Sequence, residues 1–306
     1  MKIFRLFVVA TVIGLLGLTG CSKASSQQNP SSATYTDDIG RIVQIQGVPQ
    51  RIISLSPSNT EMVYALGLQD KLVGVTSYDN YPPDVKNKTV VSDYSTTDIE
   101  KIVNAKPDLV LADNIHKNDA VPALEKLGIT VYTITADNID MFFNDLKVLG
   151  QITGKTKEAD NLVSNLKSRI QAVADKTAKL TDPQRPRVLF VTWHDPIWTA
   201  GSETMIQYLI NQAGGSNIAS DLKGYVTITL ETAIQRNPQV IIVMSSMGTQ
   251  YTSLDFIKSN DQFKSTDALK NGQIYEIDAD IFGRTTPRIV DGLETLAKLL
   301  HPELFK

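Results

Sequence analysis

The feature that most constrains the fold of this chain is an internal repeat. Residues 99–111 and 230–242 align without a gap, 131 positions apart. In each block a Glu stands second in a short helical pattern, a Pro follows that Glu by seven residues, and an apolar run comes next. Strand and helix patterns alternate around both blocks, which is typical of parallel sheets covered by helices. The sequence therefore predicts an α/β fold with two similar lobes, each built on a central, mostly parallel sheet.

One long helical pattern lies between the two halves. Apolar residues recur at helical spacing from Ala159 to Ala174, and neither Gly nor Pro interrupts residues 155–180. A helix of about 24 residues would be roughly 36 Å long, which is enough to reach across two lobes. The alternative is a helix that belongs to one lobe only. The predicted boundaries are an N-terminal lobe at 35–150, an interlobe helix at 151–181 and a C-terminal lobe at 182–306.

The amino terminus has the pattern of an export signal. Lys2 and Arg5 precede an uncharged apolar run of 13 residues, which is too short for a comfortable membrane span. Small residues and Cys21 follow, in an arrangement that resembles the lipobox of bacterial lipoproteins. We predict a signal peptide at 1–20 and a lipid on Cys21; the alternative is an ordinary signal peptide with an incidental Cys. Residues 21–34 are polar and predict a flexible tether.

Charge and motif content disfavour several classes of function. Thirty basic and 33 acidic residues give a net charge of −3, which argues against bulk electrostatic binding of nucleic acid. A single Cys excludes an intrachain disulfide and a Cys-based zinc site. The sequence contains no phosphate-binding loop, dinucleotide fingerprint, nucleophile elbow or zinc-protease motif. We therefore predict no catalytic residues, no metal held by protein ligands alone and no cofactor.

Loops that follow the predicted strands are rich in aromatic residues. Tyr78 and Tyr94 lie in two such loops of the first half, and both tryptophans, Trp193 and Trp198, lie in one loop of the second half. Ligands of open α/β sheets bind beyond the carboxyl ends of the strands, and aromatic walls hold large, mostly apolar ligands. We expect these loops, together with those at Tyr225 and at 280–284, to share a cleft.

Several segments resemble one known family. They are similar to segments of the helical-backbone substrate-binding proteins of ABC importers, which serve vitamin B12, ferric siderophores and haem. The segments are residues 51–61, 72–75, the two repeat blocks 99–111 and 230–242, and Pro287-Arg288-Ile289. The resemblance covers residues 35–306. It implies two lobes joined by one long helix, a ligand between them, modest closure, and a membrane permease with its ATPase as partners.

Within this family, the chain is most similar to the cobalamin-binding members. Tyr78 stands in a loop that resembles their loop with an aromatic ligand contact, while Tyr94, Tyr225 and Asp113 stand where those members usually carry tryptophans. These departures leave a corrinoid, a ferric siderophore and haem open as ligands. The residues that the resemblance implies as ligand contacts are Tyr78, Tyr94, Trp198, Tyr225, Asp280, Phe282 and Arg284.

Charge in the candidate loops bears on the ligand. A trianionic catecholate siderophore would need a basic pocket, because unpaired buried charge is costly. The loops lean acidic, which favours a neutral or cationic corrinoid, although a Tyr or His in them could bind the iron of haem. The acidic residues are Asp79, Asp93, Asp113, Asp195 and Asp280, against Arg284 and Lys117.

Two glutamates match a further feature of the family. The resemblance implies that one exposed Glu of each lobe meets arginines of the permease, and Glu100 and Glu231 stand at those positions. The alternative for Glu100 is a capping box with Thr97. Glu231 has Ile228 three residues before it, so capping does not explain the pair.

The sequence as a whole predicts an exported, monomeric substrate-binding lipoprotein, anchored by its lipid to the outer face of the cell membrane. It would capture a corrinoid in the interlobe cleft and deliver it to the permease. The alternatives are a ferric siderophore or haem as ligand and, from other classes, a sensory lobe or an exported metal-dependent enzyme that uses His116 and His194 with Asp195.

Overall fold

The computed structural model describes residues 32–245 and 252–306. The predicted signal peptide, Cys21 and residues 22–31 of the predicted tether lie outside the described residues. The tether does not extend to Thr34 as predicted, because Ser32–Thr36 forms strand β1. This strand pairs antiparallel with β2 (Ile42–Gln46), and Ser32 lies opposite Gln46. The described unit therefore begins with a hairpin at Ser32.

The N-terminal lobe is built on a five-stranded, fully parallel sheet in the order β5-β4-β3-β6-β7. Its central strand is apolar and buried, as expected where helices cover both faces. The strands are β3 (Ile52–Ser54), β4 (Leu72–Thr76), β5 (Val90–Ser92), β6 (Leu109–Ala112) and β7 (Val131–Thr133). The α-helices are α1 (Pro57–Ala65), α2 (Ile99–Asn104), α3 (Ala120–Lys126) and α4 (Ile139–Thr153).

The C-terminal lobe contains a six-stranded mixed sheet with the order β11-β9-β8-β12-β13, and β10 pairs with β8. Strands β8, β10, β12 and β13 are parallel, whereas β9 and β11 are antiparallel to their neighbours. The strands are β8 (Arg187–His194), β9 (Ile197–Ala200), β10 (Ser216–Asn217), β11 (Tyr225–Thr227), β12 (Val240–Met244) and β13 (Ile274–Ile277). The α-helices are α6 (Met205–Gln212), α7 (Leu230–Gln235), α8 (Ser253–Ser259), α9 (Asp267–Lys270), α10 (Ala279–Phe282) and α11 (Ile289–Leu300).

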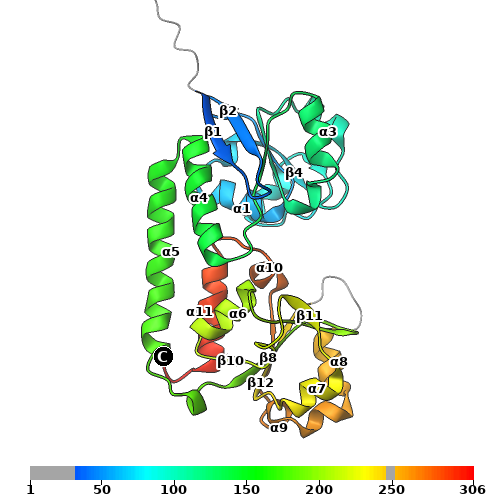
Figure 1. Cartoon of the computed structure of the whole chain (residues 1–306), viewed down its shortest axis with the longest axis vertical. Coiled ribbons are helices and arrows are strands. Elements are labelled where there is room, and N and C mark those ends of the chain that lie inside the picture. Colours follow the sequence, from blue (N-terminus) through cyan, green and yellow to red (C-terminus); the bar gives the residue numbers. More distant parts are fainter. Residues whose placement is uncertain (1–31, 246–251) are drawn as a thin grey trace, which may run out of the picture. The chain divides into compact units, whose positions relative to one another are not determined.

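Helix α5 (Thr156–Thr177) contacts elements of both lobes. It lies beside α4 of the N-terminal lobe and beside α11 of the C-terminal lobe (Figure 1). Arg169 of α5 donates to Glu294 of α11 at 2.9 and 2.8 Å. Helix α5 is shorter than the predicted segment 151–181, because α4 extends to Thr153. Gly154, which has a φ of 72°, ends α4 and separates the two helices.

The largest buried apolar cluster includes residues of both lobes and of α5, from Val43 to Leu300. The lobes therefore share one core on the α5 side and are not two bodies on a flexible linker. The predicted fold class, α/β with mostly parallel sheets, is confirmed. Among the described residues, no helix is both long enough and apolar enough to cross a membrane.

Candidate functional site

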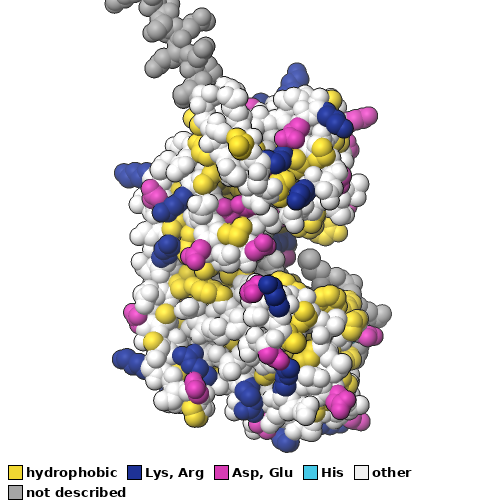
Figure 2. Space-filling model, in the orientation of Figure 1, with side chains coloured by type: hydrophobic (Ala, Val, Ile, Leu, Met, Phe, Trp, Pro, Cys, Tyr) yellow, Lys and Arg dark blue, Asp and Glu magenta, His cyan; other side chains and the backbone are white. Residues whose placement is uncertain are grey.

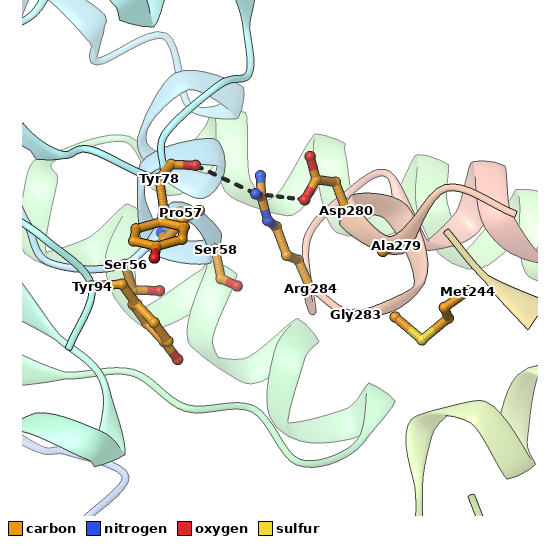
Figure 3. Close-up of a pocket in the computed structure, with 10 residues that line it drawn as sticks. All are labelled: Ser56, Pro57, Ser58, Tyr78, Tyr94, Met244, Ala279, Asp280, Gly283 and Arg284. Carbon is orange, nitrogen blue, oxygen red and sulfur yellow. Dashed lines mark hydrogen bonds and ion pairs between the residues drawn. The ribbon is translucent and has the colours of Figure 1, made fainter. Parts of the chain in front are cut away.

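A cavity of about 270 Å³ lies between the lobes, opposite the α5 side. Every segment that lines it lies at or just after the carboxyl end of a strand, as expected for a ligand site of an α/β fold. The surface is hollowed between the two lobes at this place (Figure 2). The lining residues are Ser56, Pro57, Ser58, Tyr78 and Tyr94 of the N-terminal lobe and Met244, Ala279, Asp280, Gly283 and Arg284 of the C-terminal lobe (Figure 3).

Tyr78 and Tyr94 form the aromatic wall of this cavity. Their rings meet edge to face at 6.5 Å, and Tyr78 is 50% exposed, so one ring face is available for a ligand. Buried His116 supports Tyr94 from behind: its Nδ1 accepts from the backbone N–H of Asp113, so its Nε2 carries the proton and donates to the Tyr94 carbonyl at 3.0 Å. Burial raises the pKa of the Tyr94 phenol to about 12, with a contribution from Asp113.

On the opposite wall, Arg284 and Asp280 are already paired with each other at 2.6 Å. Arg284 also donates to Asn80 Oδ1 at 2.8 Å, and Asn80 donates back to Asp280. Figure 3 shows the guanidinium between the Tyr78 carbonyl and the Asp280 carboxylate. These two predicted ligand contacts therefore also join the lobes across the cavity.

Behind Arg284 lies an ion pair that the sequence did not reveal. Glu61 of α1 accepts from Arg288 Nε at 2.8 Å and from Arg288 Nη2, and its side chain is only 2% exposed. Arg284 is a further partner of Glu61, at 3.4 Å. Ser58 and Glu61 have the sequence pattern of a capping box but do not form one, because Ser56 is the N-cap and Pro57 already begins the helix.

Three of the predicted ligand contacts lie elsewhere. Phe282 is 4% exposed and packs against Phe190 in the core at 6.2 Å, so its side chain does not line this cavity. Trp198 on β9 and Tyr225 on β11 are exposed but do not line the cavity of about 270 Å³. Although half of the Tyr225 side chain is exposed, partial burial and Asp137 raise the pKa of its phenol.

The exposed aromatic side chains of the C-terminal sheet share one face. Trp193 lies opposite Trp198 in the β8–β9 register, and Tyr225 lies opposite Ala200, two residues beyond Trp198. Because side chains two residues apart on a strand point to the same side, Trp193 and Tyr225 flank Trp198. The sequence placed Trp193 in the same aromatic loop but did not assign it a role.

The candidate loops carry less free negative charge than the sequence suggested. Asp79 is buried and accepts from the Thr76 N–H at 2.8 Å and the Thr76 hydroxyl at 2.7 Å, so it fixes a turn. Burial raises the pKa of Asp79 despite these hydrogen bonds. Asp93 is exposed, and the backbone N–H of Ser95 lowers its pKa. With Asp280 neutralised by Arg284, charge alone favours a ligand without a large negative charge.

Glu100 and Glu231 occupy equivalent positions. Each stands second in a six-residue helix, α2 or α7, and each side chain is exposed. Neither caps its helix: Asp98 accepts from the N–H of Lys101 at 3.0 Å, and Thr229 accepts from that of Thr232 at 3.1 Å. The capping box predicted for Thr97 and Glu100 is therefore wrong, and capping does not account for either glutamate.

The histidines do not converge on one site. His116 belongs to the N-terminal lobe and uses both ring nitrogens there, whereas His194 ends β8 and lies 3.2 Å from the Ser253 hydroxyl. In residues 32–245 and 252–306, no three His, Cys, Asp or Glu side chains form a group that could hold a metal ion. The arrangement that a metal-dependent enzyme would need is thus not found in this part of the chain.

An interlobe cavity at the ends of the strands is the arrangement of a binding protein, and comparison with known families agrees. Residues 52–281 match the periplasmic binding protein family. The chain belongs to this family.

Among its relatives in the family, an uncharacterized ABC transporter substrate-binding lipoprotein of Bacillus subtilis is 33% identical over 97% of each chain. A cobalamin-binding protein of Halobacterium salinarum is 30% identical over 88% of this chain and 74% of its own length. The crystal structure of a possible iron-binding, periplasmic solute-binding protein of Staphylococcus epidermidis is also similar. It is 33% identical with a TM-score of 0.73, over 83% of this chain and 99% of that one.

Proposed function

We propose that this chain is the substrate-binding lipoprotein of an ABC importer and that it captures a corrinoid between its lobes. The observation that carries the proposal is the interlobe cavity, to which each lobe contributes strand-end loops and whose wall is formed by Tyr78 and Tyr94. The family, the lipoprotein of Bacillus subtilis and the cobalamin-binding relative support it.

The cavity suits part of a large, flat ligand. Its volume of about 270 Å³ lies just below the ~300–1,000 Å³ typical of small-molecule sites. A corrinoid would therefore extend beyond it, and the exposed aromatic face of Trp198 and Tyr225 offers further stacking surface. Arg284 is matched by Asp280 and Glu61, so the lining supplies no surplus positive charge for a trianionic siderophore.

Haem is the second candidate, because Tyr78 presents a half-exposed phenol that could bind iron. Titration of the purified protein with cyanocobalamin and with hemin, followed by absorbance, separates the two ligands. If Tyr78 stacks on a corrinoid, Tyr78→Phe keeps micromolar or tighter cyanocobalamin binding and Tyr78→Ala weakens it about 5-fold, since stacking contributes on the order of 1 kcal/mol. If only hemin changes the absorbance spectrum, and Tyr78→Phe abolishes that change, the corrinoid assignment is wrong.

Glu100 and Glu231 are proposed to dock the protein on arginines of the permease. Both are exposed at equivalent positions of α2 and α7, and neither has a capping role. Glu100→Ala combined with Glu231→Ala should keep ligand affinity but abolish uptake in cells. Glu158→Ala with Glu276→Ala, which removes two other exposed glutamates, is the matched control and should transport normally. Normal uptake by the first double variant refutes the docking role.

The same proposal places the mature protein outside the cytoplasm as a monomer, attached to the membrane through a lipid on Cys21. No residue of the described body is needed for that attachment. The proposed partners are therefore the lipid bilayer, the permease with its ATPase, and one small-molecule ligand.

A further inference from the structure

A second cavity, of about 200 Å³, adjoins the first. The two cavities share Ser58, Tyr94 and Gly283 as lining residues, so they lie on either side of the same residues. Unlike the first cavity, the second is lined mainly by polar side chains. They are Ser58, Asn59, Tyr94, Asp113, Thr135 and Thr285.

Asn59 leaves a hydrogen-bond acceptor unused in the wall of this cavity. Its Nδ2 donates to the Ala112 carbonyl at 2.8 Å, which fixes the orientation of the amide. Its Oδ1 accepts no hydrogen bond from any residue that the structure describes, although the side chain is only 1% exposed. A buried acceptor without a donor costs about 1–3 kcal/mol. A ligand that donates to Asn59 would remove this cost.

Asp113 adds a second acceptor to the same wall. Burial raises its pKa, while hydrogen bonds from the backbone N–H groups of Asn114 and Ile115 favour the ionised carboxylate. Among the described lining residues there is no Lys, Arg or His to balance this charge. A second carboxylate placed beside Asp113 would therefore be repelled.

The hydroxyl groups of the cavity do not offset the repulsion between Asp113 and a second carboxylate. The Thr285 hydroxyl donates to the Ala136 carbonyl at 3.1 Å across the interlobe boundary. Since its proton is already used, this hydroxyl can only accept a hydrogen bond from a ligand. The hydroxyls of Ser58 and Thr135 can act either way. The cavity thus favours a neutral group with N–H donors over a group that only accepts.

We propose that this cavity is a subsite for one propionamide arm of the ligand, whose terminal amide donates to Asn59 and Asp113. The inference rests on the proposed function and narrows the ligand class. Corrinoids carry several carboxamide arms around the ring, whereas haem carries two carboxylates. A carboxamide supplies the donors that Asn59 and Asp113 require, and a carboxylate supplies none.

The test compares cyanocobalamin with its three monocarboxylic acids, in each of which one propionamide has been hydrolysed to a carboxylate. Dissociation constants are measured for the full-length mature protein at pH 8 by equilibrium dialysis. We expect at least one of the three acids to bind 10-fold or more weakly than cyanocobalamin. In Asp113→Asn, whose amide can donate to a carboxylate, that difference should fall below 3-fold. In Asp93→Asn, which changes an exposed carboxylate that does not line the cavity, it should persist.

The proposed function and the proposed subsite fail on different results of this experiment. If cyanocobalamin itself does not bind, the proposed corrinoid function is wrong. If cyanocobalamin binds and all three acids bind within 3-fold of it, the function stands and the subsite is wrong. The comparison of cyanocobalamin with the three acids needs only the unsubstituted protein, so it does not depend on the folding of Asp113→Asn. If the penalty is unchanged in a folded Asp113→Asn, the assignment of the arm to this cavity is overturned.

Discussion

The buried ion pair between Glu61 and Arg288 joins the lobes, and removing one of its charges should destabilise the protein strongly. Glu61 comes from α1 of the N-terminal lobe, and Arg288 precedes α11 of the C-terminal lobe. The perturbation that isolates it is Glu61→Gln, which keeps the shape of the side chain but removes its charge. Arg288 would then be left largely buried opposite a neutral amide.

The expected loss follows from the contacts. Removing one partner of a buried ion pair costs about 3–5 kcal/mol. We place Glu61→Gln at the lower end, about 3 kcal/mol, because the arginines keep slight exposure and Gln still accepts one hydrogen bond. For a large unit, about 2 °C per kcal/mol gives a fall in melting temperature of about 6 °C. Urea unfolding followed by circular dichroism measures the free energy directly.

Two further variants make this prediction specific. Asp261→Asn removes one partner of the exposed Lys264–Asp261 pair and should leave the free energy of unfolding nearly unchanged. Glu61→Leu combined with Arg288→Met removes both charges and should restore most of the stability lost in Glu61→Gln. If Glu61→Gln costs no more than Asp261→Asn, the reasoning about the buried pair is wrong.

Three more predictions concern other parts of the chain. Burial and the nearby Asp38 raise the pKa of Asp145 from its ordinary 3.8 to about 8, so stability from its protonated form is lost as the pH rises from about 4 to 8. Asp145→Asn should therefore raise the melting temperature by several degrees more at pH 8 than at pH 5, and equal gains at both pH values would contradict this. Gly150→Ala should cost about 1–2 kcal/mol in urea unfolding, because the added Cβ would meet the Ala159 Cβ at 2.5 Å; an unchanged midpoint would contradict it. Cys21→Ala should release the exported protein from the membrane fraction, and retention there would refute the lipid anchor.

Local periodicity was sufficient to predict most helices and strands, because it reports which face of an element is buried. The long α5 pattern is an example: its apolar positions from Ala159 to Val173 are buried against neighbouring helices. The alternation of strands and helices likewise predicted the parallel N-terminal sheet. These features depend on residues within one or two turns of each other, which a single sequence contains.

The role of Glu61 could not be predicted in the same way. Its local pattern, Ser-x-x-Glu, is that of a capping box, and its actual partner, Arg288, is 227 residues away in the sequence. Trp193 and Trp198 show a similar limit. They were predicted to lie in one loop, but they are opposite each other on β8 and β9. The connecting Asp195-Pro196 is not one of the usual two-residue hairpin turns, so no local signal indicated the antiparallel pair.

The proposed ligand site and the contact between the lobes use the same residues. Arg284 lines the cavity and also binds Asn80 and Glu61 of the opposite lobe. Since α5 and the shared apolar core hold the lobes on the other side, a wide opening would have to break buried ionic and apolar contacts together. Small movements of the loops around Tyr78 and Asn80 require neither. A ligand would thus change the cleft mainly through these loops, while Glu100 and Glu231, on helices of the two lobes, keep nearly the same separation.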